Sequence, residues 1–128
     1  LYNQAAKSST IAHAIGLAVK KIDPQLTLVG LSNSIMIDTW RDMGLIIAGE
    51  AFADRTYETD GSLRDRKFNN ALITNPARAA KQVMMIIKRG EIISVDGNTI
   101  SINAQTICIH SDTTNVLAIA KAVKDTEN

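Results

Sequence analysis

The apolar positions in the first part of the chain follow a helical period and then short continuous runs. One set recurs on a single face at intervals of four, three and four residues, which predicts an amphipathic helix from about residue 4 to residue 21. This set comprises Ile11, Ile15, Ala18 and Ile22. Apolar runs at 26–31 and 45–48, each bounded by turn residues, are typical of buried strands. Between them, the segment 32–34 can cap a helix of residues 35–43 that ends at Gly44.

A second stretch of helical periodicity begins at Asn75-Pro76. Asn can cap a helix, and Pro suits the first helical position because the amide there lacks an intrahelical partner. Gly90 is expected to end this helix. Its predicted apolar stripe consists of Ala80, Val83, Met84 and Ile87.

The remaining elements complete an alternation of strands and helices. Residues 91–95 and 98–102 flank Asp96-Gly97 and predict a hairpin. A last apolar strand is predicted at 105–109, and a last helix at 113–124. The residues expected to face inward in that helix are Val116, Ala120 and Val123. The order of elements predicts an α/β fold with a mainly parallel sheet and flanking helices.

Composition narrows the class of protein only modestly. A chain of 128 residues is expected to form one region with one core, and a net charge of +1 gives no support for nucleic-acid binding. The apolar runs are too short to span a membrane. The single cysteine, Cys108, cannot form an internal disulfide and fits a reducing, cytoplasmic location.

Charge is concentrated in one segment directly after the second predicted strand. Of the eighteen residues from Glu50 to Lys67, nine are charged, against 21% of the whole chain. Parallel α/β proteins bind their ligands at loops that follow the strands. The segment therefore predicts a functional site, with Glu50, Asp54 and Arg55 at the strand end.

A second polar cluster follows the last predicted strand, where His110 and Asp112 lie. If the sheet is parallel, both strand ends face the same rim. A carboxylate beside an imidazole can transfer protons near neutral pH, and the same groups can bind a divalent metal. Arg55 or Arg66 could bind a carboxylate or phosphate through two hydrogen bonds.

Each of these residues also has a simpler interpretation. Asp112 could serve only as the cap of the last helix. His110 could be a hydrogen-bonded structural residue, and the charges of the loop could be solvated. Residue patterns alone leave these alternatives open.

Several motifs together resemble one known family. The most specific is the string from Glu50 to Tyr57, Glu-Ala-Phe-Ala-Asp-Arg-Thr-Tyr, followed by Asp60-Gly-Ser-Leu63 and Arg66. The others are Leu1-Tyr2-Asn3, the Leu-Val-Gly of the first strand, Ala71-Leu-Ile73 and Gln105-Thr-x-Cys-x-His110-x-Asp112. Taken in their order along the sequence, these motifs resemble the prokaryotic LamB/YcsF family over the whole chain.

The resemblance implies a fold and an activity. Family members are about twice as long and fold as an irregular βα barrel similar to carbohydrate deacetylases, so the chain is expected to be the carboxyl-terminal half of such a barrel domain, with the amino-terminal half absent. The implied activity is that of 5-oxoprolinase, which hydrolyses the cyclic amide of 5-oxo-L-proline (pyroglutamate) to L-glutamate with ATP as co-substrate and with two further subunits. The fragment alone is expected to be inactive.

The resemblance also implies roles for particular side chains. Arg55, Tyr57 and Arg66 are expected to bind substrate or phosphate. Glu50 or Asp54 is expected to act as a base or metal ligand. His110 with Asp112 is expected to orient a proton donor. The metal content stays unknown at this stage.

The chain departs from the family pattern at two places. Ser111 replaces the usual Gly between His and Asp, and Asp65, Lys67, Asn69 and Asn70 replace the usual Pro, Ser, Pro and Gly of the loop. These departures put the rigidity of the loop and the aim of Arg66 in question.

Two other functions stay open: a metal-dependent amide hydrolase that needs no ATP, and a non-catalytic module that binds a small anion.

Overall fold

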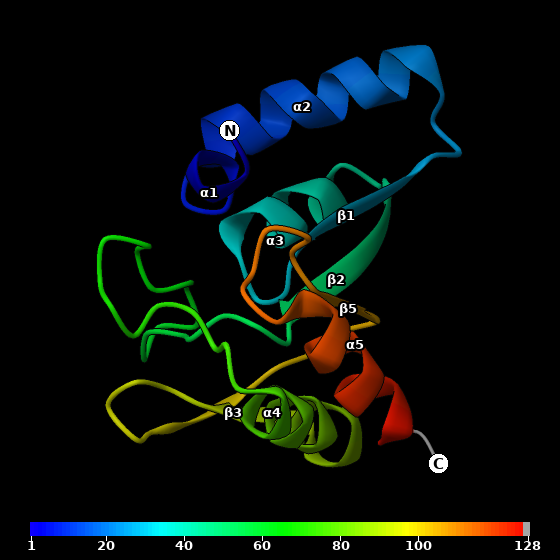
Figure 1. Cartoon of the computed structure of the whole chain (residues 1–128). Helices are drawn as coiled ribbons and strands as arrows, with labels where there is room; N and C mark the ends of the chain where they lie inside the picture. Colours follow the sequence, from blue (N-terminus) through cyan, green and yellow to red (C-terminus); the bar gives the residue numbers. More distant parts are fainter. Residues whose placement is uncertain (127–128) are drawn as a thin grey trace. The chain divides into compact units, whose positions relative to one another are not determined.

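The computed structural model describes residues 1–126, and Figure 1 shows the course of the chain. The chain divides into two compact units, which are described separately: residues 1–50 with 103–106, and residues 51–102 with the segment from 107 onward. Strands β2 (Ile46–Phe52) and β5 (Thr106–Cys108) each pass from one unit into the other. No helix within residues 1–126 has the length and apolar character needed to cross a membrane.

The first unit begins with two helices where the sequence pattern predicted one. Helix α1 spans Tyr2–Ala5 and helix α2 spans Ser9–Ile22. The predicted single helix from about residue 4 is wrong because Ser8 is extended and caps α2, its hydroxyl accepting a hydrogen bond from the Ile11 amide at 3.4 Å. The periodic apolar set begins at Ile11, within α2, so it did not mark where this helix starts.

The parallel sheet is confirmed in the first unit. Strand β1 (Thr27–Leu31) pairs in parallel with β2, in a register that places Gly30 opposite Gly49. Helix α3 (Ile35–Asp42) begins at Ser34, whose hydroxyl accepts a hydrogen bond from the amide of Ile37 at 3.4 Å. Glycine at position 30 allows close packing, because a Cβ atom there would lie 2.8 Å from Met36 and 2.9 Å from Trp40 of α3.

Strand β5 lies on the other side of β2, giving the order β1-β2-β5. The Gln105 amide donates to the Gly49 carbonyl at 2.7 Å, and the Ala53 amide donates to the Cys108 carbonyl at 3.0 Å. Residue numbers rise in the same direction along both strands from the first bond to the second, so β2 and β5 are parallel. The polar residues that follow the two strands therefore leave the sheet at the same end.

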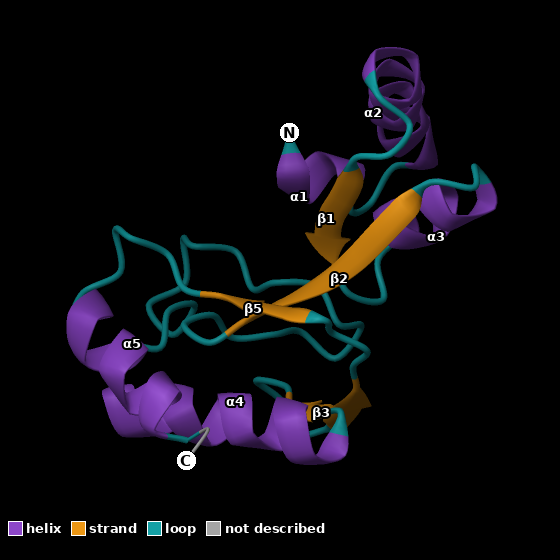
Figure 2. Cartoon of the chain, turned by 90° about the vertical axis from the view of Figure 1, so that its right-hand side faces the viewer, coloured by secondary structure: helices purple, strands orange, loops and turns teal. Residues whose placement is uncertain are grey.

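The second unit contains helix α4 (Pro76–Arg89), the antiparallel hairpin of β3 (Glu91–Ile93) and β4 (Thr99–Ser101), and helix α5 (Val116–Asp125). The predicted start and end of α4 are confirmed, since Asn75 caps it and Gly90 ends it in a left-handed conformation. Figure 2 shows α4 and α5 side by side. Their shared core includes Ile73, Ala79 and Ile119, all buried.

The inward faces of α4 and α5 are predicted correctly in part: Val83 is buried and Val123 packs against the core, but neighbouring positions differ by one residue. Helix α4 buries Ala79, Val83 and Ile86, while the predicted Ile87 is 56% exposed. Helix α5 buries Ile119, while the predicted Ala120 is exposed. Both helices carry apolar residues at adjacent positions, so periodicity alone did not determine which of two neighbouring stripes faces inward.

Gly49 offers a test of the packing in the first unit. A Cβ atom at this position would lie 2.6 Å from the Asn103 carbonyl oxygen and 2.6 Å from Ser32 Oγ. Because the backbone must move to relieve that contact, Gly49→Ala is expected to lower the free energy of unfolding by about 1–3 kcal/mol. The matched control is Ile46→Val on the exposed part of the same strand, with an expected change within about 0.5 kcal/mol. Urea unfolding measures both, and equal stabilities would contradict the packing.

Candidate functional site

Two strand ends meet in the second unit at Asp54 and His110. The Asp54 side chain has no exposed surface, and its Oδ2 accepts a hydrogen bond from the backbone amide of His110 at 3.0 Å. The His110 Nδ1 atom lies 3.0 Å from Oδ1 and 3.1 Å from Oδ2 of the same carboxylate. The predicted convergence of these strand ends is therefore confirmed for Asp54 and His110.

Thr113 completes the surroundings of the Asp54 carboxylate. Its hydroxyl donates to Asp54 Oδ2 at 2.5 Å, and Thr113 itself is 4% exposed. A buried carboxylate is costly unless hydrogen-bond donors replace its water, and three donors now do so. Thr113 therefore fixes Asp54 in place from the turn that precedes α5.

The same contacts determine how the His110 ring is presented. A carboxylate accepts hydrogen bonds, so it favours the tautomer that carries the proton on Nδ1. The ring is also stacked on Phe52, with centroids 4.9 Å apart and an interplanar angle of 10°. Within residues 1–126 no group is hydrogen bonded to Nε2, and the side chain is 24% exposed. Nε2 is thus the ring nitrogen that can exchange a proton with a ligand or water.

Arg55 is a buried cation next to this pair. It is 4% exposed, and its Nη2 donates to the Arg64 carbonyl at 2.7 Å. Burial lowers the pKa of the Arg55 guanidinium, and the charge of Arg66 lowers it further, while Asp54 acts in the opposite direction. Its Nε is a buried donor without a hydrogen-bond partner among the described residues. A buried donor of this kind is suited to bind an oxygen atom of a ligand.

Arg66 and Asp112 form an exposed ion pair, and Asp112 is not the cap of α5. Arg66 Nη1 donates to Asp112 Oδ2 at 3.1 Å, with side chains 45% and 68% exposed. The residue at the cap position of α5 is Asn115. No hydrogen bond joins Asp112 to His110 in the described part of the chain, so the imidazole has Asp54 as its carboxylate partner.

Tyr57 and Glu50 lie in different surroundings. Tyr57 is fully buried, and its hydroxyl oxygen accepts a hydrogen bond from the Phe52 amide at 2.9 Å, which makes it part of the core of the second unit. Glu50 belongs to the first unit and is the fifth residue of β2, where the sequence predicted a loop. Its carboxylate accepts a hydrogen bond from the Tyr2 hydroxyl at 2.6 Å.

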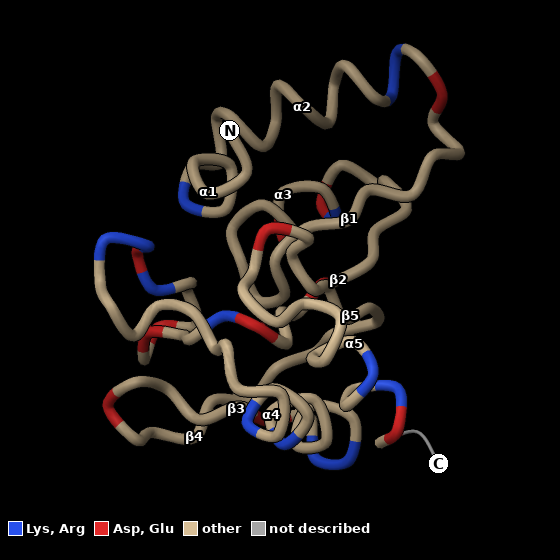
Figure 3. Tube along the Cα trace, in the orientation of Figure 1, with Lys and Arg blue, Asp and Glu red and all other residues tan. Residues whose placement is uncertain are grey.

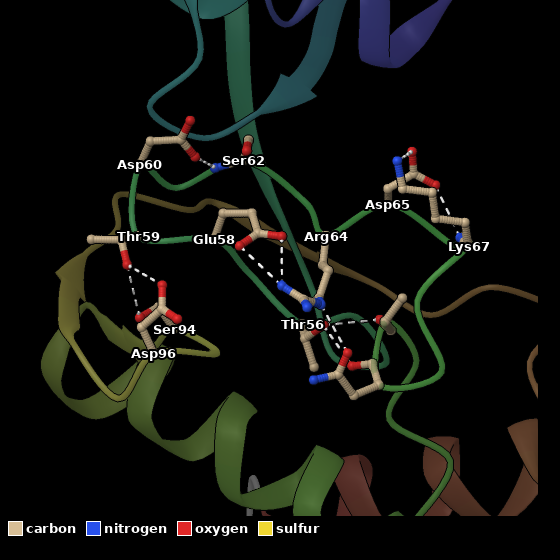
Figure 4. A network of polar contacts seen from close by, with 12 residues as sticks. Thr56, Glu58, Thr59, Asp60, Ser62, Arg64, Asp65, Lys67, Ser94 and Asp96 are labelled. Carbon is tan, nitrogen blue, oxygen red and sulfur yellow. Dashed lines mark hydrogen bonds and ion pairs between the residues drawn. The ribbon is translucent and has the colours of Figure 1, made fainter.

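The loop that departs from the family pattern is ordered by its own polar contacts, as Figure 4 shows. Arg64 donates to Glu58 at 2.9 Å and to the side chain of Asn70 at 2.8 Å, and its guanidinium lies 4.1 Å from the centre of the Phe68 ring. Asp65 accepts a hydrogen bond from the Lys67 amide at 2.9 Å. Two of the substituted residues, Asp65 and Asn70, thus supply hydrogen bonds within the loop. Ser111 is not among the described residues with positive φ, so its backbone needs no glycine.

Sequence reasoning missed Thr113 and Gln82. The amide of Gln82 donates to the carbonyls of Phe52 and Arg55, at 2.7 and 2.9 Å, and so holds the segment around Asp54. Gln82 lies three residues after the buried Ala79, and a polar residue so near an apolar stripe is a usable signal. Thr113 carried no periodic signal, because it lies in a turn. Within residues 1–126 no three His, Cys, Asp or Glu side chains form a group that could hold a metal ion.

The architecture defines an α/β protein in which neighbouring parallel strands end in a buried carboxylate paired with a partly exposed imidazole. The chain belongs to the LamB/YcsF family, whose family model matches residues 1–128.

Known proteins similar to the chain agree with this assignment. It is 45% identical over 124 residues to proteins named as the A subunit of 5-oxoprolinase from Chloroflexus aggregans and from Heliobacterium modesticaldum, covering 97% of this chain and 49% of each relative. The crystal structure of a lactam utilization protein from Thermus thermophilus superposes with a TM-score of 0.87 at 34% identity, covering 98% of this chain and 49% of that one. The chain thus spans about half the length of the relatives it matches.

The hydrogen bond from Thr113 can be tested by stability measurements. Thr113→Val keeps the side-chain shape but removes a donor from a buried carboxylate, and is expected to lower the free energy of unfolding by about 1.5–3 kcal/mol. The exposed neighbour provides the control, since Thr114→Val is expected to change it by less than about 0.5 kcal/mol. Similar stabilities of the two variants in chemical denaturation would show that the contact contributes little.

The Arg66–Asp112 pair makes a prediction about pH. The hydrogen bond from Arg66 and its charge hold the pKa of the Asp112 carboxyl below its ordinary value. Since the folded-state pKa is depressed, the pair stabilises the fold above the unfolded pKa and loses this effect as pH falls through the folded value. In a carboxyl ¹³C NMR titration, Arg66→Gln should raise the midpoint of Asp112 towards the ordinary aspartate value. An unchanged midpoint would contradict the pairing.

Proposed function

We propose that this chain supplies the proton-transfer residues of the A subunit of a 5-oxoprolinase. The reaction is hydrolysis of the lactam of 5-oxo-L-proline to L-glutamate, coupled to conversion of ATP to ADP and phosphate and carried out with two further subunits. Membership in the LamB/YcsF family and the names of the relatives support the class of substrate. The observation that carries the proposal is the buried Asp54 that orients His110 and leaves Nε2 available.

The chemistry of a lactam explains the need for such a pair. A lactam carbonyl is a weak electrophile, and transfer of a phosphoryl group from ATP to its oxygen would give a carbon that water can attack. The attacking water would lose a proton to His110 Nε2, and the imidazolium would then give that proton to the lactam nitrogen as the C–N bond breaks. Asp54 would stabilise this imidazolium, without itself taking the proton. Hydrolysis of the acyl phosphate so formed by a second water would release phosphate and L-glutamate.

Burial assigns Asp54 an orienting role in this proposal. With no exposed surface and three hydrogen-bond donors around it, Asp54 has no room for water or a metal ion. Glu50, whose carboxylate is held by the Tyr2 hydroxyl in the first unit, is proposed to act as a base or as a ligand for a divalent metal. Tyr57 is proposed to support the site from the core of its unit, because its side chain is fully buried.

Arg55 and Arg66 are proposed to bind anionic oxygens. Both the substrate carboxylate and the phosphates of ATP are anions, and arginine binds such groups with paired hydrogen bonds. Arg55 has a buried Nε without a partner in residues 1–126, and the Arg66 side chain is 45% exposed. In this proposal one ligand oxygen accepts a hydrogen bond from Arg55 Nε. Another competes with the Asp112 carboxylate for the Arg66 guanidinium.

Activity measurements on the full-length protein with its partner subunits test the assignment. Asp54→Asn and His110→Gln are each expected to lower the rate of ATP-dependent glutamate formation by roughly 100- to 10,000-fold, because proton transfer loses its oriented base. Arg55→Ala is expected to weaken substrate binding and turnover together. The controls are Asp42→Asn and Arg89→Ala, which change exposed residues outside the site and should retain full activity.

The variants must be separated from simple unfolding. Asp54→Asn and His110→Gln both alter a hydrogen bond of the buried carboxylate, so circular dichroism of each at the assay temperature, where both are expected to stay folded, accompanies the activity measurement. Wild-type rates in both Asp54→Asn and His110→Gln would end the proposal. Metal analysis of the active complex, with and without chelator, reports separately whether a divalent ion takes part.

A further inference from the structure

A cavity of about 450 Å³ lies within the second unit, outside the carboxylate–imidazole pair. Its walls come from helix α4, the start of the β3–β4 hairpin and the segment between Thr56 and Ile73. Asp54, His110 and Arg55 do not line it. The volume falls within the range of small-molecule sites in proteins.

The charged side chains of the cavity wall are both cationic. Arg78 and Lys81, one helical turn apart on α4, line the cavity, and no Asp or Glu does. Within residues 1–126, neither side chain has a hydrogen bond or an ion pair, whereas the guanidinium groups of Arg41, Arg64 and Arg66 are each paired with an acid. Figure 3 shows the Lys and Arg positions along α4. Two unpaired cations beside one cavity favour an anionic ligand.

The rest of the wall favours a ligand with an apolar body. The apolar lining side chains with accessible surface are Ile93, which is 44% exposed, and Met85 and Val95, which are partly exposed. Gln82 lines the cavity as well, with both amide protons donated to the carbonyls of Phe52 and Arg55 and its Oε1 left as an acceptor. A bare inorganic anion would contact the two cations and leave the apolar wall empty.

We propose that this cavity binds a small organic anion, a carboxylate or phosphate monoester whose acidic group binds Arg78 and Lys81 and whose apolar part lies on Met85, Ile93 and Val95. The site is separate from the proposed lactam-opening site. Whether it binds an anion does not depend on the lactam-opening activity. Gln82 connects the cavity to the carbonyls of Phe52 and Arg55, which lie on either side of Asp54 in sequence.

The key variant is Arg78→Gln/Lys81→Gln. Arg78 is the third residue of α4, where the helix dipole disfavours a positive charge, so its removal should not destabilise the helix. The matched control is Lys88→Gln/Arg89→Gln, which removes two exposed cations from the last turn of the same helix, away from the cavity.

Binding is measured on the purified protein by NMR titration of the Met85 methyl group. The probes are hexanoate and hexyl phosphate, with hexanol as the uncharged analogue and inorganic phosphate as the anion without an apolar body. Saturable shifts are expected with at least one of the two organic anions, and their relative affinities identify the preferred acidic group. The affinity is expected to fall at least tenfold in Arg78→Gln/Lys81→Gln and to stay within twofold in the control variant.

Three outcomes would overturn the proposal. The first is that neither organic anion gives a saturable shift. The second is that the two double variants bind equally well, and the third is that hexanol or inorganic phosphate binds as tightly as the organic anions. Since no turnover is measured, none of these outcomes depends on the lactam-opening reaction, and loss of that activity would leave this test unaffected.

Discussion

The burial of Asp54 is the constraint on which the rest of the site depends. A carboxylate with no exposed surface must find hydrogen-bond donors in the protein, and it finds them in the His110 backbone, the His110 ring and Thr113. These donors belong to the end of β5 and to the turn before α5. The parallel pairing of β2 with β5 brings these donors to Asp54. The strand pairing therefore sets the orientation of the imidazole.

Much of this arrangement could be predicted, because parallel strands deliver their following residues to the same end of a sheet. That rule predicts that Asp54 and His110 lie close together. The expected partner of the imidazole was Asp112, whereas the structure pairs the imidazole with Asp54 and pairs Asp112 with Arg66. The sequence could not show this, since the pairing depends on backbone direction within a loop. The role of Thr113 could not be predicted, because a single hydroxyl in a turn belongs to no periodic pattern. The inward faces of α4 and α5 could be predicted only in part, because apolar residues occupy adjacent positions in both helices.

The basic residues of the second unit fall into two groups with different roles. Arg66 is paired with Asp112, and Arg55 lies near the charges of Asp54 and Asp112, so both are close to acids. Arg78 and Lys81 line a cavity without an acid, and their charge is unbalanced. The first group fits a site in which anions are exchanged during a reaction. The second fits a site that holds one anion, and the altered loop at 64–70, ordered by its own contacts, borders that cavity at Asn70.

The central claim is that Asp54 holds His110 in the tautomer that leaves Nε2 free, and ¹⁵N NMR of the imidazole nitrogens measures this directly. His13, exposed on α2, serves as an internal reference. At a pH where the ring is neutral, the account predicts that His110 carries its proton on Nδ1. A His110 ring protonated mainly on Nε2 would contradict it.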